Sequence, residues 1–221
     1  MNSAALAESL SAPIYLLYTL LVSLTIIQRL WELSCAKRHQ AALKKVNLRK
    51  GEPERDYQLM VLVHVLWFVG LIVEPLVTHR TVPLWVACTG VVLFLFGQFL
   101  RVWALRTLGV RWNTRVLVPD PKHAENFIVG SGPYRFIRHP NYSAVILEIA
   151  ALPLVGGAYL TCVVASLLNA VILWRRIRVE EQALFALPNY RETVGRNPRF
   201  FPKLTAFKSA FAKYQAPLNP R

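Results

Sequence analysis

Two polar clusters hold the residues of this chain whose types and spacing suit binding and catalysis. Residues 131–142 form the first, which ends in Arg138, His139, Pro140, Asn141 and Tyr142. Residues 174–184 form the second, which contains Arg175, Arg176, Arg178, Glu180 and Glu181. An apolar segment joins the two and is broken near its middle by two glycines, 156 and 157. If this segment is a membrane hairpin, both clusters meet at one membrane face, and that meeting place is the predicted active site.

The first cluster has the features of a helix start. Pro140 suits the first turn of a helix, because the amide that proline lacks would have no partner there. His139 and Asn141 would then flank a helix start, where free amides and the helix dipole attract a carboxylate or phosphate. Tyr142 adds a hydroxyl at a depth where tyrosine is common. The alternative is a helix start at a membrane interface with no ligand.

The second cluster places opposite charges on one helix face. Arg176 and Glu180 are four residues apart and would lie side by side on a helix. A surface ion pair of little energetic value is the simpler interpretation. Facing the helix start of the first cluster, however, this pair suits a small zwitterion. The acids would take an ammonium or ribose hydroxyls, and the helix start would take a carboxylate.

Composition indicates a membrane protein. The 221 residues are 54% hydrophobic and only 17% charged, with a mean hydropathy of +0.35, whereas soluble domains carry about 25% charged residues. The net charge of +14 comes from short basic clusters beside apolar runs, which is typical of topogenic charge and argues against nucleic-acid binding. The three cysteines are widely spaced, so we predict no metal site and no disulfide.

The predicted fold is an all-α polytopic membrane protein with five transmembrane helices. The apolar runs cover residues 13–33, 58–78, 83–105, 141–155 and 158–174, and the last two form a helical hairpin. With the N-terminus outside, every basic loop and the C-terminus lie in the cytosol, as the positive-inside rule requires. We expect a three-span membrane region over residues 1–110, a core with a cytosolic cofactor site over 111–204 and a tail over 205–221.

The clusters resemble those of the isoprenylcysteine carboxyl methyltransferase family, whose members are integral membrane enzymes that use S-adenosylmethionine. The matching residues are Gly132-Pro133-Tyr134, Arg138-His139-Pro140-Asn141-Tyr142, Glu180-Glu181, Leu184, Tyr190 and Pro202. The resemblance covers about residues 110–204, and the N-terminal half matches only in having three spans.

This resemblance implies an S-adenosylmethionine pocket at the cytosolic face, closed by the tail. The residues that it assigns to the cofactor are Phe127, Ile128, Val129, Tyr134, His139, Pro140, Asn141, Tyr142 and Glu180. Arg176 matches an arginine of the substrate side and would orient an acceptor carboxylate. A hydroxyl acceptor would benefit from a base, for which Glu181 or His139 is the nearest candidate.

The acceptor implied by the resemblance is lipophilic and reaches the enzyme through the bilayer. The family name implies the carboxylate of a prenylated cysteine, whereas similar bacterial proteins are associated with O-methylation of alkylpyrones and related polyketide lipids. The compact chain favours a bacterial-type member in the cell (inner) membrane. The sequence specifies neither the acceptor nor the oligomeric state.

Two other classes compete with this interpretation. Membrane reductases of the sterol type, which use NADPH, have a similar C-terminal region but are usually much longer. A small non-enzymatic transporter would also hold polar residues within apolar spans, but transporters commonly show internal repeats, and none is visible here.

Overall fold

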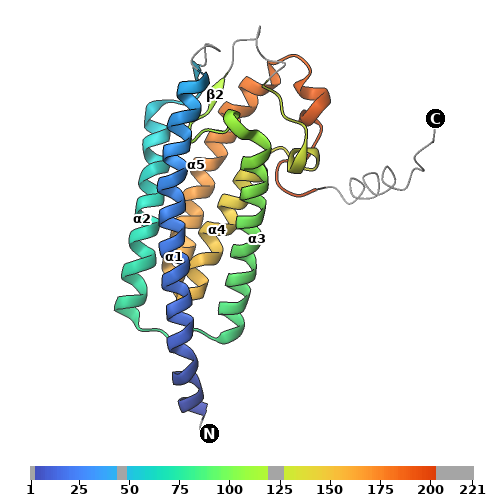
Figure 1. Ribbon diagram of the computed structural model, residues 1–221. Coiled ribbons are helices and arrows are strands. Elements are labelled where there is room, and N and C mark those ends of the chain that lie inside the picture. The colour runs from blue at the N-terminus through green and yellow to red at the C-terminus, as the bar shows by residue number, and fades with distance from the viewer. Residues whose placement is uncertain (1–2, 44–48, 119–126, 203–221) are drawn as a thin grey trace, which may run out of the picture.

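The structure is a computed structural model that describes residues 3–43, 49–118 and 127–202. Its helices run as an up-and-down bundle (Figure 1). In chain order the elements are α1 (Ser3–Ala42), β1 (Arg49–Lys50), α2 (Glu54–Thr78), α3 (Leu84–Leu108), η2 (Gly109–Arg111), β2 (Leu117–Val118), η4 (Gly132–Arg135), α4 (Pro140–Gly156), α5 (Tyr159–Phe185) and η5 (Arg191–Gly195). The predicted tail over 205–221 lies outside the described residues.

Four helices of the described chain are long and apolar enough to cross a membrane. They cover Ala12–Ala42, Glu54–Thr78, Leu84–Arg111 and Tyr159–Phe185. The predicted span at 141–155 corresponds to α4, which has 17 residues and is thus about 26 Å long, whereas a bilayer core is about 30 Å thick. The chain is therefore a multi-pass membrane protein with four candidate spans, and α4 does not reach the length expected of a fifth.

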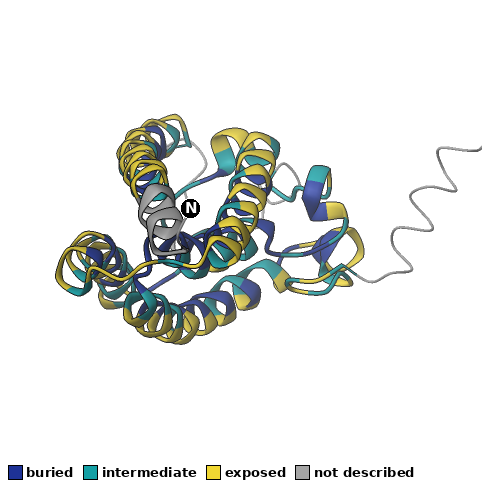
Figure 2. Cartoon of the chain, turned by 90° about the horizontal axis from the view of Figure 1, so that it is seen from below, coloured by how far each residue is buried: buried dark blue, intermediate teal, exposed yellow. Residues whose placement is uncertain are grey.

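The α4 helix lies inside the bundle rather than at its outer surface. Its buried positions include Ala144, Glu148, Ile149 and Leu152. Viewed along the bundle, buried residues turn toward the middle and exposed ones turn outward (Figure 2). Outward-facing apolar residues such as Leu76 and Trp85 are exposed by 65% and 73%. An apolar outer surface of this kind suits a lipid environment.

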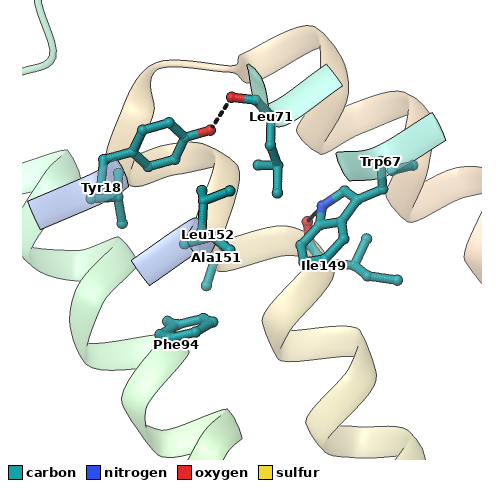
Figure 3. Packing of buried hydrophobic residues seen from close by; sticks show 10 residues of the cluster. Tyr18, Trp67, Leu71, Phe94, Ile149, Ala151 and Leu152 are labelled. Atoms are coloured by element: carbon teal, nitrogen blue, oxygen red, sulfur yellow. Dashed lines mark hydrogen bonds between the residues drawn. The ribbon is translucent and has the colours of Figure 1, made fainter. Parts of the chain in front are cut away.

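The core brings residues of every long helix against α4. It includes Tyr18, Trp67, Phe94, Ile149 and Leu152 (Figure 3). The Tyr18 hydroxyl donates to the Leu71 carbonyl at 2.6 Å, and the Trp67 indole donates to the Ile149 carbonyl at 3.2 Å. The polar atoms of both aromatic side chains are thereby satisfied inside the bundle.

The turn between α4 and α5 has the geometry of the predicted hairpin. Gly157 ends α4 with a φ of +73°, a conformation that favours glycine. Gly156 packs directly against the ring of Tyr18. A side chain at this position would clash, since its Cβ would come within 2.3 Å of the ring. Glu74 of α2 accepts hydrogen bonds from the amides of Leu160 and Thr161 at 2.9 and 2.7 Å. This acid, unusual within an apolar run, therefore caps the start of α5.

The α5 helix extends well beyond the span predicted at 158–174. It continues to Phe185 and carries the second polar cluster as a helical projection at the end of the bundle where α4 begins (Figure 1). Residues 109–118 cross the same end, and β2 pairs there with β1 in an antiparallel register of Arg49 with Val118. The two polar clusters therefore meet, as the hairpin interpretation predicted.

Candidate functional site

A cavity of about 440 Å³ lies where the two polar clusters meet. All the predicted site residues line it except Pro140 and Glu181. Those that line it are Phe127, Ile128, Val129, Tyr134, His139, Asn141, Tyr142, Arg176 and Glu180. Residues separated by up to 53 positions in the sequence thus converge on one space, which is the size of a small-molecule site.

The helix start at Pro140 presents its side chains to this cavity. His139 is the N-cap residue and Pro140 the first residue of α4, so the first-turn amides lack an intrahelical partner. The rings of His139 and Tyr142 stack with their centroids 5.3 Å apart. The Asn141 Oδ1 is buried and has no hydrogen-bond partner within the described residues. An orphaned acceptor beside free amides fits a ligand that carries both donor and anionic groups.

Tyr142 joins the two polar clusters. Its hydroxyl donates to Glu180 Oε2 and accepts from Arg176 Nε at 2.9 Å. Arg176 and Glu180 thus lie on the same face of α5, as predicted. They are connected through the Tyr142 hydroxyl, which hydrogen-bonds to both. Tyr142, Arg176 and Glu180 all line the cavity.

Glu52 does not line the cavity itself but supports the lining residue Arg176, and the sequence analysis missed it. Its Oε2 lies 3.0 Å from Arg176 Nη1, and its Oε1 accepts from the Val116 amide at 3.1 Å. Burial raises the pKa of the Glu52 carboxyl, although Arg176 and the Val116 amide oppose this effect. In the sequence Glu52 is only one acid in a basic loop, and no spacing relates it to residues more than a hundred positions away.

Tyr134 of η4 and Tyr190, which precedes η5, line the cavity on the side of these two segments. Both rings are buried, at 8% and 4% exposure. Burial raises the pKa of each phenol, so both hydroxyls are protonated and able to donate near neutral pH. Asn197 donates to the Tyr134 carbonyl at 2.9 Å and so ties this loop to the C-terminal segment.

Glu181 faces away from the cavity and holds the C-terminal segment against the helix start. It lies 3.0 Å from Arg138 Nη1, 3.0 Å from His139 Nε2 and 2.6 Å from Arg199 Nη2. The same segments are joined through the backbone, where the amides of Arg138 and His139 donate to the carbonyls of Pro198 and Arg199 at 2.9 and 3.1 Å. A carboxylate engaged by three cationic or imidazole groups is poorly placed to take a proton from a bound acceptor.

The cavity continues from the polar end into the bundle. Its inner wall is formed by apolar side chains of α1 and α2, including Ile26, Leu30, Val61 and Val65, together with His64. Leu30, Val61 and Val65 are each exposed by 40% or more. The inner part of the cavity therefore suits an apolar ligand that approaches between these two helices.

A buried ionic cluster borders this inner part. Arg29 and Glu32 of α1 contact Arg101 of α3 and Glu148 of α4, with Arg101 Nη2 to Glu32 Oε2 at 2.6 Å and Arg29 Nη1 to Glu32 Oε2 at 2.6 Å. The two positive and two negative charges balance. In the sequence, Arg29 and Glu32 lie near the end of the apolar run 13–33 and Arg101 lies near the end of the run 83–105, and nothing there relates them to one another.

No group of three or more His, Cys, Asp or Glu side chains able to hold a metal occurs in the part of the chain that the structure describes.

Comparisons with known proteins converge on one family. Residues 90–186 match the model of the isoprenylcysteine carboxyl methyltransferase family. The uncharacterized protein YpbQ of Bacillus subtilis is 37% identical over 76% of this chain and 96% of its own length. The protein-S-isoprenylcysteine O-methyltransferase B of Arabidopsis thaliana is 28% identical over 63% and 69%. The human protein-S-isoprenylcysteine O-methyltransferase is 29% identical over 56% and 44%.

Proposed function

The chain belongs to the isoprenylcysteine carboxyl methyltransferase family, and on this premise we propose that it transfers a methyl group from S-adenosylmethionine to a carboxylate or hydroxyl oxygen of a lipophilic acceptor. The observation that carries the proposal is the single cavity, which joins the family's polar motif to an apolar wall within the bundle. A donor and an acceptor of opposite polarity can meet in such a space without leaving the protein.

The polar end of the cavity fits the cofactor. The first turn of α4, after Pro140, offers the amides of Asn141 and Tyr142 to the methionine carboxylate. Glu180 and the orphaned Asn141 Oδ1 are suited to the ammonium group or ribose hydroxyls. Phe127, Ile128 and Val129 offer apolar surface for the adenine.

The reaction needs alignment more than strong acid–base chemistry. The bound cofactor supplies an electrophilic methyl group on a positively charged sulfur. Glu180 and Glu52 place negative charge near the polar end, which favours a cationic ligand. Tyr142 and Arg176 hold the two carboxylates in place, and the apolar wall excludes water from the acceptor side.

We assign the polar end to the cytosolic face of the cell (inner) membrane. This end of the bundle carries the loop after α1, the segment between α3 and α4, and the C-terminal segment (Figure 1). At the other end, the link after α2 contains a single arginine, Arg80. The positive-inside rule then places the N-terminus outside and the C-terminus in the cytosol.

Calorimetry with S-adenosylhomocysteine on detergent-purified protein tests this function. We expect wild-type protein to bind the ligand, and Glu180→Gln to weaken binding at least about tenfold, because a charge-assisted hydrogen bond is worth about 1.5–3 kcal/mol. Glu192→Gln is the matched control, since Glu192 is exposed and does not line the cavity.

NADPH serves as the competing ligand in the same experiment. Binding of NADPH without S-adenosylhomocysteine would replace the proposal by the reductase interpretation. Folded protein that binds neither ligand would favour the transporter. Neither alternative is favoured by the family match.

A further inference from the structure

A second cavity, of about 200 Å³, lies against the outer face of α4 and α5. Ile146 and Trp174, which line it, are exposed by 39% and 53%, so it opens on the apolar outer surface of the bundle. Asn169 and Leu173 belong to the wall that it shares with the first cavity. The methyl transfer proposed above does not use this space. The remaining lining residues are Ile149, Ser166, Ala170, Ile177, Arg199 and Phe200.

The second cavity has the length of one lipid leaflet. Along α5 its lining runs from Ser166 to Ile177, which is a rise of about 16 Å. A bilayer core about 30 Å thick gives each leaflet about 15 Å. The polar lining residues Ser166 and Asn169 lie at the deep end, one turn apart, and the apolar part lies between them and the polar end of the bundle. The cavity therefore suits a single acyl chain of the leaflet that adjoins the polar end.

The mouth of the second cavity carries an incompletely neutralised arginine. Arg199 donates to Glu181 through Nε at 3.0 Å and through Nη2 at 2.6 Å, and in the described part of the chain no partner is recorded for its Nη1. Glu181 is shared with Arg138, whose Nη1 lies 3.0 Å away. Two guanidinium groups thus have one carboxylate between them, and one positive charge is left over where the cavity reaches the membrane surface.

A second arginine stands beside the same mouth. Arg178 is exposed and stacks on the Trp174 ring, with its guanidinium carbon 3.9 Å from the ring centroid. No ion pair of Arg178 is recorded among the residues that the structure describes. Tryptophan is common at the membrane interface, and arginines at this depth attract anionic lipid headgroups.

We propose that the second cavity binds an anionic phospholipid, with an acyl chain along α5 and the phosphate beside Arg199 and Arg178. The charge left over at the mouth favours a headgroup with a net negative charge, whereas a zwitterionic headgroup brings its own cation. Because Arg199 also fastens the C-terminal segment to Glu181, the bound lipid would support the segment that covers the helix start at Pro140. The inference does not depend on the proposed methyltransferase function.

Native mass spectrometry of the full chain, freed of lipid in detergent, tests the headgroup. The probes are dioleoyl phosphatidylglycerol and dioleoyl phosphatidylcholine, and no methyl donor or acceptor is present. We expect wild type to bind phosphatidylglycerol more tightly. Because each arginine near a lipid surface contributes about fivefold, Arg178→Gln/Arg199→Gln should weaken phosphatidylglycerol binding about 25-fold and change phosphatidylcholine binding by less than about twofold.

Two further variants keep this comparison interpretable. Arg178→Gln alone removes no ion pair recorded in the described structure and should weaken phosphatidylglycerol binding about fivefold. Arg106→Gln is the matched control, because Arg106 is an exposed arginine in the last turn of α3 that lines neither cavity. Thermal unfolding in detergent shows that each variant is folded.

Ala170→Trp tests the chain site. The indole would fill the second cavity while leaving both arginines in place, so we expect it to weaken the binding of both phospholipids. Leu167→Trp is the matched control, because Leu167 is exposed by 64% on the same helix and does not line the second cavity.

Three results would overturn the proposal. Equal affinities for the two phospholipids in wild type and in the arginine variants would leave an apolar groove without headgroup recognition. Binding of glycerol phosphate as tight as that of phosphatidylglycerol, with no effect of Ala170→Trp, would indicate a free-phosphate site. A dimer of the lipid-free protein that Ala170→Trp dissociates would assign the second cavity to another copy of the chain.

Discussion

Glu180 and Glu181 are neighbours in the sequence but serve different parts of the structure. Adjacent residues on a helix point in directions about 100° apart. Glu180 therefore reaches Tyr142 and the cavity, whereas Glu181 reaches Arg138, His139 and Arg199. We accordingly propose Glu181 as a positioning residue that fastens the C-terminal segment over the helix start, in place of the base suggested by the sequence.

Glu181→Gln separates these two roles. Without the charge, Arg138 and Arg199 lose their common partner, and we expect the affinity for S-adenosylhomocysteine to fall about tenfold, with kcat at saturating donor nearly unchanged. Calorimetry and initial rates measure the two quantities. A drop in kcat of about 100-fold with normal binding would instead support Glu181 as the base.

At the scale of helices, α1, α3 and α4 are joined by four charges inside the apolar bundle. Glu32 and Glu148 are exposed by 3% and 1%, and Arg101 by 6%. A single charge buried in this way is costly, but a complete set that balances is tolerated. The cluster also borders the inner cavity, and it ties α1, which forms part of the apolar wall, to α3 and α4.

Arg101→Met shows whether this balance matters. The substitution leaves Glu32 and Glu148 sharing only Arg29, and we expect it to destabilise the fold by about 3–5 kcal/mol. The double variant Glu32→Met/Arg101→Met leaves Arg29 paired with Glu148 and should recover most of the loss. Thermal unfolding in detergent measures both. Additive destabilisation in the double variant would show that the charges act independently.

At the scale of the whole molecule, the distribution of charge supports the proposal that the two ends of the bundle face different compartments. The polar end carries the cavity mouth and the loops rich in arginine and lysine, while the α2–α3 link at the opposite end holds Arg80 alone (Figure 1). A cofactor made in the cytosol would reach the cavity directly, and an acceptor dissolved in the bilayer would reach it between α1 and α2.

Reporter fusions test this orientation in a bacterial host. We expect green fluorescent protein at the C-terminus to fluoresce, because the proposed orientation puts that end in the cytosol. Alkaline phosphatase inserted in the link at residues 79–82 should be active, since the proposed orientation puts that link outside. The reversed pattern would contradict the orientation and would place the cofactor site away from its supply.

The sequence by itself determined the membrane class, the helical fold and the family, and nine of its eleven predicted site residues line the cavity. These features depend on local signals: apolar runs of sufficient length, a proline at a helix start, and two short motifs at either end of a hairpin. The prediction that α4 is a fifth transmembrane span was less secure. An apolar sequence does not distinguish a helix that faces lipid from one that is buried among other helices.

Tertiary structure alone decided which polar groups share the site. Glu52 precedes α2, His64 lies on α2, and the ionic cluster joins α1, α3 and α4, so no short motif of the sequence brings these groups together. The direction of Glu181 was likewise decided by the C-terminal segment that folds back onto it. Contacts between side chains of different helices depend on how the helices cross and on which charges must be neutralised once they are buried. Local sequence patterns predict neither of these.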